Sequence, residues 1–488
     1  MLRSVAVVGA GATGTSAVVH LARCGVAQRI DVFEPGAIGH GDAFSSTDPA
    51  LLCNTSADSM SLMADRPDDF VDYLHGLGFP VTPLDCVPRY LFAQYCRDRY
   101  LGVRSAASAL GVHLQHHREK VVSVAGAGPG YTLRTGSGAE WPADAVMLCM
   151  GMDAWTPPVI RPFRSYSGVT PASALGPAAA LPHDARVLVL GSRLSAVDAV
   201  ITLGRSGARV QMASPSGTLP SVRTRMYPDS SASGSLTALA GHPWVETTDA
   251  GQAERFVAGL VRCLAGHGRP HLRDQLSLAH DPVERLRAEI TIAEEGRNFW
   301  QELTVEFIAL TNEWLLRQPP AVWQDFWVIV EDVLDRYISA MPVSNAKKLL
   351  SLADAGRLEV GRRRPTELTR TGDRWAMKWR DGSCDHFDAV VYATGYRPPS
   401  MRCSEGRLLL GEHRRGAPAA LSADLRVDLG RDMDERVFAV GQCSATRVPL
   451  VHGVVAVVPQ ISRVVRELRA LPARSCRGVG QSLPVFHP

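Results

Sequence analysis

The chain has 488 residues, of which 45% are hydrophobic and 21% are charged, with a formal net charge of +3 at pH 7. This length predicts two or three domains with full-sized cores, and the composition is typical of a globular protein. The small net charge excludes the strongly basic class of proteins that bind nucleic acid or anionic membranes. No run of eighteen apolar residues occurs, and Leu2-Arg3 leads directly into the first predicted strand. Neither a membrane span nor a signal peptide is therefore expected, and the predicted location is the cytoplasm.

The first predicted strand, Val5 to Val8, runs into a glycine-rich turn, Gly9-Ala10-Gly11-Ala12-Thr13-Gly14. This turn fits the G-x-G-x-x-G template. In that template the first glycine permits a tight turn, the second lets the backbone approach a pyrophosphate, and the third lets the helix pack against the strand. A helix is predicted from about Thr13 to Cys24, with its positive N-terminus directed at the phosphates.

The next predicted strand, Ile30 to Phe33, ends at Glu34, twenty positions after Gly14. A carboxylate at this spacing accepts hydrogen bonds from ribose hydroxyls. A glycine turn alone is weak evidence, but strand, turn, helix, strand and acid in this order predict a dinucleotide site.

A second apolar strand, Val187 to Leu190, precedes the turn Gly191-Ser192-Arg193-Leu194-Ser195-Ala196. Arg193 occupies the middle glycine position, and two interpretations stay open. Either its guanidinium clamps a phosphate, or nicotinamide binding at this turn is weak or lost. The strand that ends at Ser214 lacks an acid, and Arg223 and Arg225 follow it, which favours a 2′-phosphate if the site is live.

Other segments extend this architecture. The strand Val146 to Cys149 ends near Gly151, and a long helical region is predicted from about Ala253 to Leu352. Its aromatic residues are expected to form packing contacts rather than a substrate cage: Phe299, Trp300, Trp314, Trp323, Phe326 and Trp327. Late in the chain, one strand runs into Ala393-Thr394-Gly395-Tyr396, another runs into Gly441-Gln442, and a closing helix covers about Val454 to Leu468.

The ten cysteines include no C-x-x-C pair and no metal-ligand spacing. This excludes a redox dithiol and predicts no metal site. Cys149 and Cys443 are expected to be small buried side chains rather than catalytic thiols.

Four segments carry a resemblance to a known group: the first turn with Glu34-Pro35, residues 52–61 followed by 70–74, residues 189–198 and residues 437–460. With these segments the chain resembles the bacterial FAD/NAD(P)-binding flavoproteins. They belong to the two-dinucleotide-binding-domain superfamily that includes flavin monooxygenases and lysine/ornithine N-hydroxylases. The resemblance implies an α/β fold with two Rossmann-like domains, FAD at the first turn and NADP at the second. The expected domains are 1–160 with 380–488 for FAD, 161–240 with 340–380 for NAD(P), and a helical insertion, 240–350, that caps the active site.

In such proteins the segment around Asn54 lies beside the flavin, and the segment after Gly441 passes the pyrimidine end of the isoalloxazine. Gln442 stands where relatives often place an aspartate on the ribityl chain, and an amide can still hydrogen-bond a hydroxyl. The predicted cofactor-binding residues are Gly9, Gly11, Ala12, Thr13, Gly14, Glu34, Pro35, Asn54, Val121, Gly151, Gly191, Ser192, Arg193, Ser195, Gly395, Gly441 and Gln442.

The predicted catalytic residues are Asn54, Met60, Ser61, Arg447 and His452. Arg447 is a candidate to pair with a substrate carboxylate. His452 is a candidate to tune flavin N1 or a substrate amine, against the alternative that it is an ordinary core histidine.

The resemblance implies an FAD-dependent, NAD(P)H-using monooxygenase that N-hydroxylates a small amine or amino-acid-like substrate through a flavin C4a-hydroperoxide, as in secondary metabolism. The cofactor carries the difficult steps, so no nucleophile–base dyad is needed. The expected partners are that substrate and molecular oxygen, with neither nucleic acid nor a membrane, and a homo-oligomer is compatible with the sequence. Two alternatives remain: a flavin oxidase or dehydrogenase with a vestigial NAD(P) site, and a non-catalytic flavin-binding scaffold.

Overall fold

The structure is a computed structural model of the chain. It describes residues 1–176, 181–226, 254–255, 258–259, 271–319, 322–323, 325–326, 328, 331, 336–411, 416–431, 434–451 and 453–471. The predicted catalytic residue His452 and the aromatic residue Trp327 lie outside this described part.

The first domain is built on a five-stranded parallel sheet with the order β23-β7-β1-β2-β3. Its strands are β1 (Leu2–Val8), β2 (Ala27–Phe33), β3 (His113–His117), β7 (Ala145–Leu148) and β23 (Val437–Ala439). The helices are α1 (Ala12–Arg23), α2 (Gly41–Phe44), α3 (Asp69–Gly76), α4 (Arg89–Ala106) and α12 (Val454–Ala470). Helix α1 packs against α4 and α12, so the C-terminal helix completes the core around the first turn.

The second domain has a five-stranded parallel sheet with the order β14-β11-β10-β18-β9. Its strands are β9 (Val169–Pro171), β10 (Arg186–Leu190), β11 (Arg209–Ser214), β14 (Leu358–Arg362) and β18 (Ala389–Tyr392). Helix α5 (Leu194–Arg205) follows the second turn, and α11 (Val343–Asp354) packs against α5 and α8 (Pro282–Glu294). In both sheets the strand that carries the glycine-rich turn occupies the central position. This arrangement confirms the predicted α/β fold with two Rossmann-like domains.

Smaller sheets are attached to each domain. A six-stranded sheet, β22-β20-β21-β4-β5-β6, joins two distant parts of the chain: β4 (Val121–Ala127), β5 (Gly130–Thr135), β6 (Glu140–Ala143), β20 (Met401–Ser404), β21 (Arg407–Leu410) and β22 (Ala417–Pro418). The second domain carries an antiparallel sheet of β15 (Pro365–Thr371), β16 (Arg374–Trp379) and β17 (Cys384–Phe387).

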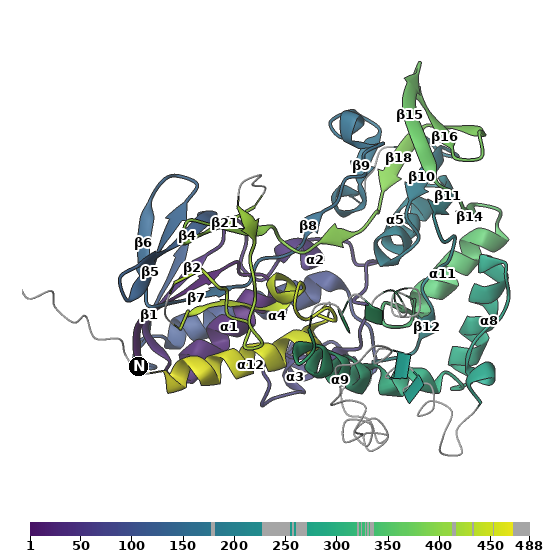
Figure 1. The fold of residues 1–488 in the computed structure, drawn as a ribbon. Coiled ribbons are helices and arrows are strands. Elements are labelled where there is room, and N and C mark those ends of the chain that lie inside the picture. Colours follow the sequence, from purple (N-terminus) through teal and green to yellow (C-terminus); the bar gives the residue numbers. More distant parts are fainter. Residues whose placement is uncertain are drawn as a thin grey trace, which may run out of the picture.

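The two domains lie side by side and are joined by two antiparallel segments, β8 (Asp153–Ala154) and β19 (Tyr396–Arg397) (Figure 1). The position of β18 in the second sheet corrects the predicted domain boundary at residue 380. β18 pairs with β10 in parallel, so the second domain extends to Tyr392 before the chain returns to the first.

The helical insertion lies between β11 and β14. It contains β12 (Val222–Arg223), which pairs with β13 (Met341–Pro342), together with α8 and α9 (Thr304–Leu316). Helix α9 packs against α12 of the first domain, below the space between the two sheets in Figure 1. Among the helices of the described residues, none is both long and apolar enough to cross a membrane.

Candidate functional site

The first turn has a geometry that only glycine satisfies. Gly9 has a φ of +91°, and a Cβ at this position would lie 2.7 Å from the carbonyl oxygen of Cys149. A Cβ on Gly14 would lie 1.8 Å from the carbonyl oxygen of Gly9. Strand β1, the turn and helix α1 therefore approach one another too closely for any side chain.

A cavity of about 950 Å³ begins at this turn and extends to the second domain. Its volume is at the upper end of the range for small-molecule and cofactor sites. Of the predicted cofactor-binding residues, those that line it are Gly9, Gly11, Ala12, Thr13, Glu34, Pro35, Asn54, Val121, Gly151, Ser195 and Gln442. Met60, a predicted catalytic residue, also lines it. The cavity thus brings together segments that are far apart in the sequence.

Glu34 is held at the mouth of the first turn by backbone donors. Its Oε2 accepts a hydrogen bond from the Ala10 N–H at 2.9 Å, and its Oε1 accepts one from the Gly36 N–H at 2.8 Å. A carboxylate has about four lone-pair sites, so acceptor capacity remains for ribose hydroxyls.

Gln442 leaves an acceptor unused beside the same cavity. Its Nε2 donates to the carbonyl oxygen of Val451 at 2.9 Å, whereas its buried Oε1 has no hydrogen-bond partner in the described part of the chain. A buried acceptor without a donor is costly, and a hydroxyl or N–H of a bound cofactor would satisfy it. Gly441, just before it, has a φ of +59° and lies so close to Thr13 that a Cβ would be 2.9 Å from its Oγ1.

These residues fit FAD. The glycine-rich turn leads into the N-terminus of α1, where backbone N–H groups and the helix dipole favour a pyrophosphate. Glu34 is positioned for a ribose, and Gln442 Oε1 lies further along the same cavity with its acceptor free.

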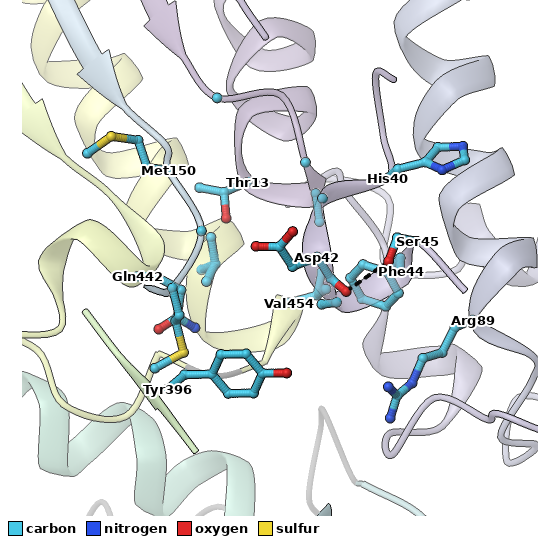
Figure 2. Close-up of a pocket in the computed structure, with 18 of the residues that line it drawn as sticks. Thr13, His40, Asp42, Phe44, Ser45, Arg89, Met150, Tyr396, Gln442 and Val454 are labelled. Carbon is cyan, nitrogen blue, oxygen red and sulfur yellow. Dashed lines mark hydrogen bonds between the residues drawn. The ribbon is translucent and has the colours of Figure 1, made fainter. Parts of the chain in front are cut away.

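The sequence did not draw attention to Asp42, whose carboxylate points into the cavity toward Thr13 (Figure 2). Partial burial raises the pKa of Asp42, and the nearby carboxylates of Glu34 and Asp153 raise it further. The only signal in the sequence was the position of Asp42 after the second strand. Charged residues are common in loops because water solvates them there, so this position alone does not indicate a site.

We expect Asp42→Asn to tighten FAD binding, because the substitution removes a negative charge next to the pyrophosphate path. A gain of about 1 kcal/mol corresponds to roughly fivefold in Kd. In the unmodified protein FAD binding should also tighten as pH falls through the raised pKa of Asp42, since the protonated carboxyl does not repel the pyrophosphate. Fluorescence titration of apoprotein with FAD across pH measures both effects.

The control for this experiment is Asp65→Asn, because Asp65 is an exposed residue that pairs with Arg23 outside the cavity. It should leave the FAD affinity unchanged. Two results would contradict the role assigned to Asp42. One is weaker FAD binding by Asp42→Asn, and the other is the same pH dependence of FAD affinity in Asp42→Asn as in the unmodified protein.

Arg89 was also absent from the predicted site. It lines the cavity from helix α4, and its Nη2 lies 2.7 Å from Oδ2 of Asp198 on helix α5 of the second domain. Its Nε donates to the carbonyl oxygen of Leu52, beside the Asn54 segment. A second ion pair, Asp48 with Arg205, joins the same two parts of the molecule. These pairs fix the second turn relative to the first.

The second turn repeats the backbone geometry of the first. Gly191 has a φ of +118°, and a Cβ there would lie 2.2 Å from the carbonyl oxygen of Ala393. Arg193 is the N-cap residue of α5, and Ser192 Oγ lies 2.8 Å from Ser214 Oγ in a buried contact. The small pocket beside this turn, lined by Ser195 and Gly395 among others, has a volume of about 20 Å³. That is close to the space for one water molecule.

Two described residues that were predicted to be catalytic, Ser61 and Arg447, do not line the cavity. Ser61 Oγ contacts the carbonyl oxygens of Met63 and Arg66. Arg447 donates to the carbonyl oxygens of Leu315, Leu316 and Gln318 at the C-terminal end of α9. That is a favourable position for a cation at a helix terminus. Arg447 therefore tethers the insertion to the first domain.

The arginines that follow Ser214 are not at the end of β11. Arg225 pairs with Asp58 at 2.6 Å, and Arg223 lines the main cavity together with residues of the insertion. Ser214 itself is buried and lies outside the lining. The expectation that both arginines favour a 2′-phosphate at this strand end is therefore not met by their positions.

Two structural expectations are confirmed. Phe299, Trp314 and Phe326 belong to one buried cluster of the insertion, with Trp323 packed against it, and Trp300 is also buried. Cys149 and Cys443 are buried, and burial raises the pKa of the Cys443 thiol to about 12.

Known proteins resemble this chain in the sequence of its first domain and in its fold. Residues 6–153 match the family described as FAD-NAD(P)-binding, so the first domain is a dinucleotide-binding domain of this kind. Over nearly the whole chain the fold is similar to that of solved hydroxylases and monooxygenases, in agreement with the predicted resemblance. No curated protein matches the chain in sequence.

Three solved structures illustrate the likeness. The ornithine hydroxylase of Pseudomonas aeruginosa is 14% identical, with a TM-score of 0.58, and the match covers 96% of this chain and 98% of that one. The cadaverine monooxygenase of desferrioxamine biosynthesis from Erwinia amylovora, solved with FAD, is 15% identical, with a TM-score of 0.59 and coverage of 100% and 99%. L-lysine 6-monooxygenase from Pseudomonas syringae is 15% identical, with a TM-score of 0.57 and coverage of 96% and 99%.

Proposed function

We propose that this protein is an FAD-dependent, NADPH-using monooxygenase that N-hydroxylates a small amine or amino acid. The single observation that carries the proposal is the continuous cavity. It begins at the first dinucleotide turn, passes Gln442 and the Asn54 segment, and ends against helix α5 and the helical insertion. The solved structures with this fold include hydroxylases of ornithine, lysine and cadaverine.

Bound FAD would supply the activation of oxygen, with one oxygen atom going to the substrate nitrogen and the other leaving as water. The residues of the chain bind and orient. The N-terminus of α1 would hold the pyrophosphate, Glu34 would hold a ribose, and Gln442 Oε1 would accept a hydrogen bond from the cofactor.

Apart from Arg223 and Ser339, the described residues of the insertion that line the cavity are apolar. Ile308 of α9, Ile338 and Leu450 line it. An apolar wall excludes water from the reacting centre, and this exclusion strengthens the polar interactions that remain and prevents side reactions. The insertion is therefore the part of the chain that closes the site.

A second candidate is a flavin oxidase or dehydrogenase reduced by its own substrate. Two observations favour it: Arg193 stands at the middle glycine position of the second turn, and the pocket beside that turn has room for about one water.

Stopped-flow mixing of the oxidised holoenzyme with NADPH, without oxygen, tests the proposal. We expect NADPH to bleach the visible absorbance of the flavin. If Arg193 clamps a phosphate, Arg193→Ala should raise the NADPH concentration needed for half-maximal rate by about tenfold or more, as for loss of a charge-assisted hydrogen bond. Bleaching by an organic substrate alone would favour the second candidate, and bleaching by neither would indicate a scaffold.

A further inference from the structure

Arg223 is a buried cation without a counter-ion. It is 3% exposed on β12 and, among the described residues, forms no ion pair. Its hydrogen bonds go to backbone carbonyl oxygens: Nε to Ala340 at 3.2 Å, and Nη2 to Ile338 at 2.6 Å and to Ala340 at 3.0 Å. Its Nη1 is buried and has no hydrogen-bond partner in that same part of the chain.

A buried charge in this state is expensive. Removing a guanidinium from water costs several kcal/mol even after relaxation, and two carbonyl groups return only part of that. Burial lowers the pKa of Arg223 to about 10, so the group is still charged at neutral pH. An unpaired buried charge lowers the stability of the folded protein, so its presence is best explained by a ligand that pairs with it.

No described carboxylate forms an ion pair with Arg223, and two buried carboxylates elsewhere in the molecule have other partners. Asp58 is paired with Arg225, and Asp198 is paired with Arg89. Cys86 is close to Arg223, but burial raises the pKa of its thiol to about 11, so it is neutral at pH 7. The protein therefore does not supply an anion for Arg223 from the described groups around it.

The cavity is where an anion can reach Arg223. Arg223 lines the main cavity, and so do the apolar residues Met226, Ile308, Ile338 and Leu450 and the small polar residue Ser339. This part of the lining adjoins the Asn54 segment, since Ser56 Oγ bonds both the backbone N–H and the carbonyl oxygen of Met226. A single cation among apolar side chains is the arrangement that fixes the acidic end of a small ligand.

Building on the proposed function, we propose that Arg223 binds the carboxylate of the substrate, which makes the substrate an amino acid rather than a simple diamine. The apolar wall around it takes the carbon chain, and the amine to be hydroxylated points away from Arg223. A 2′-phosphate of the nicotinamide nucleotide is the less suitable anion. A 2′-phosphate would lie at the end of β11, and Ser214 at that strand end does not line the cavity that Arg223 lines.

The test is calorimetric binding to the oxidised, FAD-loaded protein, which needs neither NADPH nor oxygen. The probes are L-ornithine and L-lysine, each compared with its decarboxylated diamine, 1,4-diaminobutane or cadaverine. We expect at least one amino acid to bind about 10- to 150-fold more tightly than its diamine, the effect of one hydrogen-bonded charge pair. Arg223→Met should remove this preference, and the dicationic diamine should bind at least as tightly as before because a like charge has been removed. Arg223→Lys should keep part of the preference.

Thermal unfolding separates this role from a structural one. If Arg223 serves the ligand, Arg223→Met should retain the unfolding midpoint of the ligand-free protein or raise it, because an uncompensated buried charge has been removed. A large fall in the midpoint for both Arg223→Met and Arg223→Lys would show that Arg223 acts only by tying residues 338–340, and would overturn the proposal.

The proposal also fails if neither amino acid binds more tightly than its diamine, or if Arg223→Met keeps the preference. These outcomes are distinct from failure of the proposed function. The protein can bind amino acids through Arg223 and still not be reduced by NADPH, in which case only the proposed function fails. It can also be reduced by NADPH without preferring amino acids, in which case only the role of Arg223 fails.

Discussion

Gly14→Ala is expected to prevent accumulation of folded, flavin-loaded protein. The new Cβ would lie 1.8 Å from the carbonyl oxygen of Gly9, and both atoms belong to backbone held by β1 and α1. Side-chain rotation cannot relieve this contact, so the helix must shift away from the strand. Overpacking of cores costs about 1–3 kcal/mol and occasionally more, and we expect this substitution to exceed about 3 kcal/mol.

The measurements are the ratio of flavin to protein after purification and the midpoint of urea unfolding. Gly102→Ala is the matched control, because Gly102 is exposed on the solvent side of α4 and nothing lies within 4 Å of the added Cβ. That substitution should keep flavin content and stabilise the protein by about 0.5–1 kcal/mol. A Gly14→Ala protein with normal flavin content and midpoint would show that the close packing at the first turn is not required.

Arg89→Ala is expected to cost about 3–5 kcal/mol of unfolding free energy, the range for removing one partner of a buried ion pair. Asp198 is 8% exposed and would be left as a buried carboxylate without its partner. The loss of the Arg89 side-chain bond to Leu52 would also remove one of the contacts that hold the Asn54 segment beside α4, and the backbone hydrogen bonds of Arg89 and Cys53 would remain. We therefore expect flavin reduction by NADPH to slow as well, because only the ion pair of Asp48 with Arg205 then remains of the two that join the domains.

The pH dependence identifies Asp198 as the cause. Burial already raises the pKa of Asp198, with Arg89 acting in the opposite direction, so removing Arg89 should raise it further. The folded state then binds more protons than the unfolded state between the unfolded and the raised folded pKa, and stability falls as pH rises through that window. Arg89→Ala should accordingly regain stability as pH is lowered from neutrality, until it passes the unfolded pKa of the carboxyl.

Two variants serve as controls for this experiment. Asp198→Asn in the Arg89→Ala background should restore part of the lost stability, since it removes the uncompensated charge. Arg23→Ala removes an exposed ion pair with Asp65 and should cost less than about 1 kcal/mol. Equal costs for Arg89→Ala and Arg23→Ala would mean that the pair between the domains contributes no more than a surface contact.

The sequence was sufficient for the parts of the site that depend on local order. The strand, the glycine turn, the helix and Glu34 are consecutive, and the physical demands on Gly9 and Gly14 arise from backbone only a few residues away or from the next strand of the same sheet. The same reasoning located Gln442 at the end of β23. Apolar runs at both turns predicted the central strands of two parallel sheets, because a buried parallel strand is continuous in hydrophobicity.

Sequence reasoning failed for residues whose role depends on the position of the side chain in the folded protein. Arg447 lies in a segment associated with the flavin, yet its guanidinium extends to the C-terminus of α9. Asp42 and Arg89 gave no periodic or motif signal, since a single charged residue in a loop or at a helix start is usually solvated. The residues of β18 were predicted to belong to the first domain. Their pairing with β10, about two hundred residues earlier in the chain, cannot be recognised from the local sequence.

The sequence by itself therefore determined that this protein has a dinucleotide-binding domain and a second domain of related design, because glycine turns and apolar strands are local requirements. The tertiary structure alone decided which charges meet. It paired Arg89 with Asp198 across the domains, and it left Arg223 buried in the cavity lining with no counter-ion among the described residues. The physical reason is that the energy of a charge depends on its burial and its partners, and both are properties of the folded chain.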